Sequence, residues 1–281
     1  MTGGIFLSVL FAALLHAGWN ALVKGGADKM LGIAAVVTGQ GVAALLVLPF
    51  VAVPDPSCWP WLAASVVLHI GYQFFLGFAY RIGDLSQVYP IARGVAPLIV
   101  TTVSVSVLGV ALGRAELMAV CIIAAGIMSL SLVRRRDGLR NRNAALLALA
   151  TGCFIAGYSL VDGIGARIAG TGVGFYAWSS LANTALYLAI GSAMRPDLVR
   201  DLRGTVRMIL IGGGASFTAY AIAVNAFMHA PIALVTALRE TSIIFALLIG
   251  VLFLGERLDL AKVVSTMLTL CGAALLRLSK G

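Results

Sequence analysis

Two arginines, Arg93 and Arg239, lie inside long apolar stretches of the sequence. A charged side chain at the centre of a membrane span costs about 2.5–3.5 kcal/mol on the insertion scale, so such residues usually serve a function. A guanidinium is planar and binds a carboxylate or phosphate through two parallel hydrogen bonds. Two arginines that face one cavity would bind an anionic group in this way. We therefore predict Arg93 and Arg239 as the binding residues for such a group.

An acidic neighbour offers a second interpretation of the same residues. Glu240 follows Arg239 directly, and adjacent residues of a helix point to different sides, so these two cannot pair well with each other. Glu240 could instead pair with Arg93 across the bundle, because buried charges usually need partners. The sequence leaves both interpretations open, an anion site and an Arg93–Glu240 ion pair. Glu240 belongs to the predicted site in either case.

A proline marks the segment around Arg93. Pro97 has no N–H, and the carbonyl that it would bond, four residues earlier, is that of Arg93. The helix is predicted to kink or open there, and we expect Pro97 to act as a hinge. Interrupted helices at membrane depth often form binding sites. Tyr89, one turn before Arg93, shares its face and joins the predicted site. The segment around Arg239 has Ile243 where the first has Pro97.

Further polar side chains recur at helical spacing within apolar stretches. Steps of three or four residues put side chains on one helix face, and polar residues in membrane spans face the bundle interior or a wet cavity. Hydrogen bonds between helices would explain any one pair about equally well, but the number of polar faces favours a hydrated central pathway. The residues that we predict to line it are His16, Trp19, Asn20, Gln73, Tyr158 and Tyr220, with His69, Asp162, Tyr176 and Ser216 at helical spacing from them.

Composition indicates the class of protein that must position these residues. Hydrophobic residues make up 60% of the chain, charged residues only 11%, and the mean hydropathy is +1.01. A soluble domain carries about 25% charged residues. Since about 20 apolar residues cross the bilayer as a helix, the fold class is an all-α membrane protein with ten transmembrane helices. The predicted spans are 4–23, 31–53, 59–80, 85–108, 115–133, 144–164, 172–194, 206–228, 231–254 and 259–278.

The ten spans form two related halves. A shift of 146 residues (239 minus 93) places Arg93 on Arg239 and, without a gap, Gly126 on Gly272. Residues 1–136 and 144–281 are the predicted repeats, and 137–143 is a basic linker between them. Each repeat holds five spans, and an odd number turns the second copy upside down in the membrane. Such inverted five-helix repeats are typical of many secondary transporters.

The charge distribution predicts the orientation. The net charge is +9 at pH 7, with 20 lysines and arginines. Odd-numbered loops and their flanks hold 14 of these 20, against four on the other face and two inside spans. By the positive-inside rule the odd loops are cytoplasmic and both termini are external. The basic charge is then a topology signal and not a nucleic-acid-binding surface. We expect a multi-pass protein of the bacterial inner (plasma) membrane, with the lipid bilayer as partner, and leave a homodimer open.

Other classes of function find less support. The four cysteines and three histidines are scattered and form no metal-binding spacing or redox pair, so neither a metal nor a cofactor is expected. No serine lies in a G-x-S-x-G turn, and a membrane-embedded enzyme would need a nucleophile, base or metal cluster near the interface. A channel would need rings of charges or carbonyls. Enzyme and channel remain the alternatives to a carrier.

Several short motifs give a family resemblance over essentially the whole chain. Ala17-Gly18-Trp19-Asn20 reappears near the start of the second half as Ala156-Gly157-Tyr158-Ser159. With YPIARGVAP at 89–97, ALRETS at 237–242 and FLGERL at 253–258, the chain resembles the EamA-like ten-span branch of the drug/metabolite transporter superfamily. The resemblance implies an inverted-repeat helical bundle with a central cavity, which carries a small-molecule substrate by alternating access. Relatives carry amino acids, drugs, nucleotide sugars or phosphorylated compounds, and we expect an anionic or zwitterionic metabolite such as an amino acid, organic acid or phosphonate.

Overall fold

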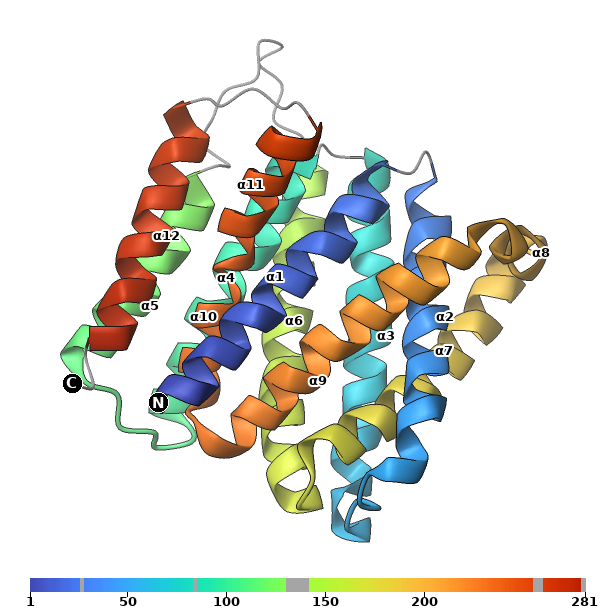
Figure 1. Cartoon of the computed structure of the whole chain (residues 1–281), viewed down its shortest axis with the longest axis horizontal. Coiled ribbons are helices and arrows are strands. Elements are labelled where there is room, and N and C mark those ends of the chain that lie inside the picture. Colours follow the sequence, from blue (N-terminus) through green and yellow to red (C-terminus); the bar gives the residue numbers. More distant parts are fainter. Residues whose placement is uncertain (26–27, 83–84, 130–141, 255–259, 279–281) are drawn as a thin grey trace.

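The computed structural model describes residues 1–25, 28–82, 85–129, 142–254 and 260–278, and these are almost entirely helical (Figure 1). The first half contains α1 (Gly3–Gly25), α2 (Lys29–Val47), α3 (Trp59–Ile82), α4 (Leu85–Ser106) and α5 (Arg114–Ser129). The second half contains α6 (Arg142–Ala169), α7 (Gly172–Met194), a short α8 (Leu198–Leu202), the π-helical turn η5 (Met208–Gly213) that leads into α9 (Gly214–His229), then α10 (Ile232–Arg239), α11 (Ser242–Leu254) and α12 (Leu260–Leu278).

Seven helical segments of the described chain are long and apolar enough to cross a membrane, and a shorter apolar helix covers Val263–Leu278. The chain is therefore an all-α membrane protein, as the composition predicted. The predicted spans 115–133 and 172–194 correspond to α5 and α7, which are helical but do not belong to this set of seven. The count of ten spans thus stays a prediction. The seven segments are Gly3–Val23, Lys29–Phe50, Pro56–Ile82, Val88–Ser106, Arg142–Ala169, Met208–His229 and Ile232–Leu252.

The two halves pack with the symmetry of a repeat. α3 packs on α6 and α9 packs on α1, while α4 packs on α6 and α10 with α11 packs on α1. α2 packs on α7, and α5 on α12. Exchanging the halves turns each pair into another pair of this set or into itself. α1 and α6, which begin the halves, also run in opposite directions across the bundle (Figure 1).

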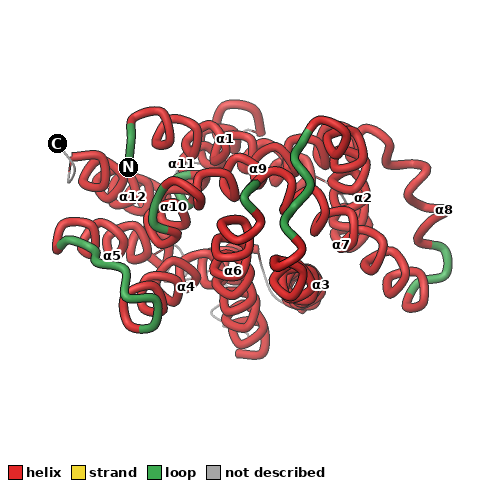
Figure 2. The backbone as a smooth tube through the Cα atoms, turned by 90° about the horizontal axis from the view of Figure 1, so that it is seen from below, coloured by secondary structure: helices red, strands yellow, loops and turns green. Residues whose placement is uncertain are grey.

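An inverted repeat requires such an arrangement. The boundaries of the repeats at 1–136 and 144–281 stay predictions, and residues 137–141 of the predicted linker lie outside the described residues, as do 255–258 of the FLGERL motif. Seen from the end of the bundle, α6 lies near its middle, with α5 and α12 to one side and α2 and α7 to the other (Figure 2). The central helices are thus shielded by helices from both halves.

Glycines let two of these helices cross with their backbones in contact. A Cβ atom added at Gly39 of α2 would overlap the Ile209 carbonyl oxygen of η5, and one at Gly213 would overlap the Gly39 backbone. Such small residues allow close approach of membrane helices. One turn further into α9, Gln40 Nε2 donates to Ser216 Oγ (2.8 Å). The glycine crossing therefore holds α9 against α2 where both helices carry polar side chains.

The ninth predicted span is divided in two. α10 ends at Arg239 and α11 begins at Ser242. Between them the N–H of Thr241 donates to the Leu238 carbonyl, three residues earlier (3.1 Å), and Thr241 Oγ1 donates to the same carbonyl (2.7 Å). Bonds to the third residue back tighten the chain and compete with the helical pattern. The chain therefore turns at Glu240, directly after the second arginine.

The opening predicted at Arg93 is not found. α4 stays helical from Leu85 to Ser106 with Pro90 and Pro97 inside it. Membrane helices tolerate internal prolines when neighbouring groups satisfy the freed carbonyls. The interruption thus belongs to the second half, which lacks the proline, and the hinge role of Pro97 stays a prediction.

Candidate functional site

A buried ion pair joins the two halves at the centre of the bundle. Arg93 Nε donates to Glu240 Oε2 at 2.8 Å, and the two side chains are only 6% and 3% exposed. Arg93 comes from α4, and Glu240 from the turn between α10 and α11. The turn after Arg239 thus carries the carboxylate that neutralises the other arginine. The sequence left two interpretations open for Glu240, and the structure contains the ion pair with Arg93.

Three further residues contact Arg93. Its Nη2 donates to Ser242 Oγ (3.3 Å), and its Nη1 lies 3.1 Å from His16 Nε2. A guanidinium only donates, so His16 Nε2 must accept and His16 is neutral. Neutral imidazole has one accepting nitrogen, so the Trp19 Nε1 contact to His16 Nδ1 (3.3 Å) competes with the Arg93 contact. The Tyr89 ring centroid lies 5.8 Å from Arg93 Cζ, within range of a cation–π contact.

Arg239 has a different environment. Its Cζ lies 4.7 Å from the centroid of the Tyr220 ring, and the residue is 7% exposed. Within the described part of the chain, no carboxylate lies within ion-pair distance of its guanidinium and no hydrogen-bond acceptor is recorded for it. Arg239 lines a cavity and Arg93 does not. The two arginines therefore differ: the charge of Arg93 is neutralised by Glu240, whereas that of Arg239 faces open space.

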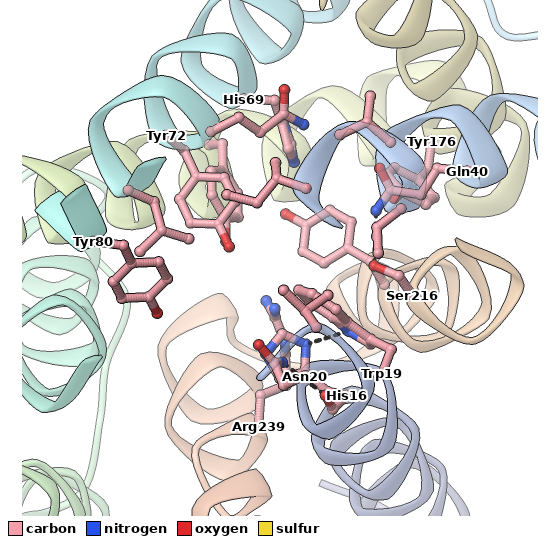
Figure 3. Close-up of a pocket in the computed structure, with 18 residues that line it drawn as sticks. His16, Trp19, Asn20, Gln40, His69, Tyr72, Tyr80, Tyr176, Ser216 and Arg239 are labelled. Atoms are coloured by element: carbon pink, nitrogen blue, oxygen red, sulfur yellow. Dashed lines mark hydrogen bonds between the residues drawn. The ribbon is translucent and has the colours of Figure 1, made fainter. Parts of the chain in front are cut away.

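The cavity beside Arg239 is small, and several aromatic side chains line it. Its volume is about 80 Å³, counted as the space open to the centres of water-sized molecules. This is room for several waters or one small metabolite. Arg239 lies beside His16 and Asn20, with His69 and Tyr72 across the cavity (Figure 3). The lining residues are His16, Trp19, Asn20, Val23, Ile33, Val36, Val37, Gln40, His69, Tyr72, Gln73, Leu76, Tyr80, Tyr158, Tyr176, Ser216, Tyr220 and Arg239.

Most of the predicted site residues meet in this cavity. His16, Trp19, Asn20, Gln73, Tyr158, Tyr220 and Arg239 line it, while Arg93, Glu240, Tyr89 and Pro97 do not. Gln40, Tyr72 and Tyr80 were not predicted. Gln40 is a polar residue inside an apolar span, and that feature alone could have identified it.

A second buried polar cluster lies against the wall of the cavity. Asp162 of α6 is fully buried, and its Oδ2 accepts a hydrogen bond from the Tyr220 hydroxyl (2.6 Å). His69 Nε2 lies 3.8 Å from the same oxygen. The His69 ring stacks on Tyr158 with centroids 4.2 Å apart, and the Tyr176 ring meets the Tyr220 ring edge to face at 4.8 Å. Tyr220 thus contacts both Asp162 through its hydroxyl and Arg239 through its ring.

The cavity extends toward one end of the bundle. Its lining comes from the C-terminal parts of α1 and α3 and the N-terminal part of α2, so it points to the end where α1 turns into α2. At the other end Arg167 Nε and Nη2 donate to the Phe227 carbonyl (2.9 and 2.7 Å), and Nη2 donates to the Ala230 carbonyl (3.0 Å). A cation at these last carbonyls of α9 stabilises the helix end. The Asp55 N–H also donates to the Ala169 carbonyl there (3.2 Å), which ties the halves together on that side.

No group of three His, Cys, Asp or Glu that could hold a metal occurs in the described residues. The site's chemistry is therefore that of a guanidinium, two imidazoles, a carboxylate, amides and phenols. Such groups bind and orient a polar solute in a cavity. Together with the membrane-spanning fold, this describes a polytopic membrane protein with a polar cavity inside its helical bundle.

Comparison with known proteins finds a family match in the second half of the chain. Residues 142–278 match the model of the EamA-like transporter family, a family of membrane transporters. The resemblance predicted from the motifs is thus confirmed over these residues. A crystal structure of a protein with 20% sequence identity superposes with a TM-score of 0.78, covering 99% of this chain and 98% of the other, so the fold extends over both halves. No significant match to a curated protein is found.

Proposed function

We propose that the protein is a secondary transporter that moves a small anionic or zwitterionic metabolite across the bacterial inner membrane by alternating access. The observation that carries this proposal is the Arg239 guanidinium, which faces the cavity without a carboxylate of its own. A buried charge is costly unless it is paired. A carboxylate or phosphonate that enters the cavity supplies the missing partner, and Arg239 can bind it through two parallel hydrogen bonds.

The other residues of the cavity indicate which chemical groups and what size the rest of the substrate can have. Tyr72, Tyr158, Tyr176 and Tyr220 offer ring faces and hydroxyl groups, while Gln40, Gln73 and Asn20 offer amides. Ring faces favour a flat or apolar body, and an ammonium group also binds well over them. With the small volume of the cavity, these groups favour an organic acid or amino acid over a large drug. Arg93, Glu240 and Tyr89 support the cavity from behind and do not contact this solute directly.

Alternating access is supported by the difference between the two ends of the bundle. The cavity extends toward one end, and the other is closed by Arg167 and by the contact of Asp55 with Ala169. A carrier needs a second state in which these contacts open and the first end closes. We propose that the cavity end is cytoplasmic, from the positive-inside rule. Tags at 54–58 and at the C-terminus should then be external and tags within 134–143 cytoplasmic, and the reverse result would overturn the orientation.

A channel is the remaining alternative from another class. The open pore of a channel has no closed end, whereas a carrier is always closed at one end. In sealed vesicles, a carrier also shows saturable counterflow. The closed end beside Arg167 favours the carrier. A homodimer stays a prediction.

Ligand binding tests the role of Arg239. We expect purified protein to bind benzoate, phenylphosphonate or L-phenylalanine in calorimetry and not benzamide, which has the shape of benzoate without its charge. Charge-assisted hydrogen bonds contribute about 1.5–3 kcal/mol, so Arg239→Gln should weaken anion binding roughly 10- to 100-fold, and Arg239→Lys less. Arg277→Gln removes the same charge at an exposed helix end and should bind as wild type. Equal binding of benzoate and benzamide, or wild-type affinity in Arg239→Gln, would contradict the proposal.

A further inference from the structure

Two hydrogen-bond acceptors face each other beside the cavity. His69 Nδ1 lies 3.0 Å from the Ser65 backbone carbonyl oxygen. A carbonyl only accepts, so this bond places the proton of the neutral ring on Nδ1 and leaves a lone pair on Nε2. That lone pair lies 3.8 Å from Asp162 Oδ2, and an ionised carboxylate also only accepts. A proton bound to either group would turn this contact into an attractive one.

The carboxylate is poorly satisfied as it stands. Asp162 is fully buried, its Oδ1 has no hydrogen-bond partner, and its Oδ2 accepts a hydrogen bond from Tyr220, while the Ser65 hydroxyl also stabilises the ionised carboxylate. An ionised carboxylate has about four lone-pair positions, so these two hydroxyls leave part of its capacity unsatisfied. His69 lines the cavity and its side chain is 14% exposed. Water in the cavity can therefore deliver a proton to His69, which lies between the cavity and Asp162.

Charged and titratable side chains surround this cluster, and they come from the helices packed on α6. His69 belongs to α3, Tyr176 to α7, Tyr220 to α9, and Arg239 and Glu240 to α10 and the turn that follows it; Arg93 and Tyr89 belong to α4, and Tyr158 lies on α6 itself. Arg93 and Glu240 neutralise each other. Arg239 is the remaining cation that acts on Asp162, and it acts across the Tyr220 ring. A second anion at Arg239 would remove that compensation.

Charge balance then links the two sites. The described centre of the bundle holds two arginines, Arg93 and Arg239, and two carboxylates, Glu240 and Asp162. An anionic group bound at Arg239 would add one negative charge in a low-dielectric region, where uncompensated charge is costly. One proton at the acceptor pair restores the balance. Tyr220 contacts both sites, so each site affects the other directly.

We propose that His69 and Asp162 form a proton-binding site that takes up one proton when the anionic group of the substrate binds at Arg239. The two ligands then move together, and the carrier is an anion–proton symporter. This proposal rests on the proposed function for its coupling, but the proton site itself can be tested without any substrate. By linkage, the anion must raise the proton affinity by the same factor as the proton raises the anion affinity.

The first experiment uses the ligand-free protein. The chain has three histidines, so 15N-histidine NMR gives a small set of resonances that His69→Gln and His229→Gln assign. We expect the His69 ring resonances to change as the acceptor pair binds a proton on acidification, and to lose this change in Asp162→Asn, which keeps the size of the side chain. The His229→Gln variant should leave the His69 titration unchanged. His69 resonances that do not change with pH, or that change identically in Asp162→Asn, would overturn the proton site.

The second experiment measures the coupling. Calorimetric titration with benzoate in two buffers of different ionisation heat reports how many protons the protein takes up. We expect uptake approaching one proton in wild type, with an affinity that falls by up to about tenfold per pH unit as the pH rises, and none in Asp162→Asn. Benzoate binding without proton uptake would overturn the coupling while leaving the transporter proposal intact. Absence of benzoate binding at any pH, with His69 still titrating, would overturn the anion site and its coupling and leave only the proton site.

Discussion

Neutralising the Arg93–Glu240 pair from either side tests whether it holds the two halves together. The variants are Arg93→Gln, Glu240→Gln and the double change, which remove one or both charges and keep polar side chains, and Glu240→Gln also keeps the size of the side chain. Both side chains are almost completely buried, so water cannot solvate the charge that remains after a single change. The cost of each variant therefore depends on which other groups can compensate that charge.

The surroundings predict an asymmetric result. Removing one member of a buried ion pair costs about 3–5 kcal/mol, whereas removing both is often close to neutral. In Glu240→Gln the Arg93 guanidinium keeps only the neutral acceptors His16 and Ser242, so the loss should be near the upper value. In Arg93→Gln the carboxylate is still influenced by the charge of Arg239, so the loss should be near the lower value. The double variant should lie within about 2 kcal/mol of wild type.

Thermal unfolding in detergent measures these differences. At about 2–4 °C per kcal/mol for a chain of this size class, the single variants should melt roughly 6–20 °C below wild type, and the double variant much closer to it. Benzoate binding to the double variant should persist, because Arg239 is unchanged. Single variants as stable as wild type, or a double variant as unstable as the sum of the singles, would refute the assignment of Arg93 to a structural pair.

Three further predictions follow from other parts of the fold. Gly213→Ala should overpack the α2–α9 crossing and cost about 1–3 kcal/mol, while Gly214→Ala, whose Cβ meets nothing within 4 Å, should be neutral or slightly stabilising; equal melting temperatures would contradict the close crossing. Burial alone would raise the pKa of Asp28, but the helix N–H that it caps and the Arg195 guanidinium lower it overall from 3.8. The ion pair therefore stabilises the fold above that value and is lost as the pH falls through the lowered pKa. Because the two side chains are 41% and 40% exposed, Asp28→Asn should lower the free energy of unfolding by less than about 1 kcal/mol at pH 7. In melting curves, this difference between the variant and wild type should disappear as the pH falls below 3.8. A difference that stays constant with pH would show that the charge of Asp28 does not contribute. Pro97→Ala should leave folding intact but slow counterflow if α4 bends there during transport, and wild-type rates would show that the proline is incidental.

Sequence patterns predicted the helices well where local signals end them. The predicted span 172–194 coincides with α7 (Gly172–Met194), because Thr171 caps its first turn and Arg195-Pro196 follows its end. The division of the ninth span could not be predicted in this way. Apolar residues flank the short polar stretch from Arg239 to Ser242 on both sides, and the ion pair that accompanies the turn joins Glu240 to Arg93, almost 150 positions away in the sequence. Only the packed structure brings those two side chains together.

The site was predicted only in part, because it too depends on contacts between helices. Helical spacing places His69 with Gln73 and Tyr158 with Asp162, since both pairs lie on single helices. It gives no information about contacts between helices, so the approach of His69 to Asp162 could not be derived. Tyr72 was missed because a lone tyrosine in a span has an ordinary place in the interfacial belt of a membrane protein.

The predicted repeat also accounts for the different surroundings of the two arginines. A shift of 146 residues places Gly94 on Glu240. The residue of the first copy that corresponds to Glu240 is therefore a glycine and carries no carboxylate. A Cβ at Gly94 would lie 2.5 Å from the Met128 side chain of α5, so an acid there would require that side chain to move. An acid at position 94 would, by the symmetry of the packing, pair with Arg239 as Glu240 pairs with Arg93. With one carboxylate for two arginines, the ion pair forms at Arg93, and Arg239 lines the cavity.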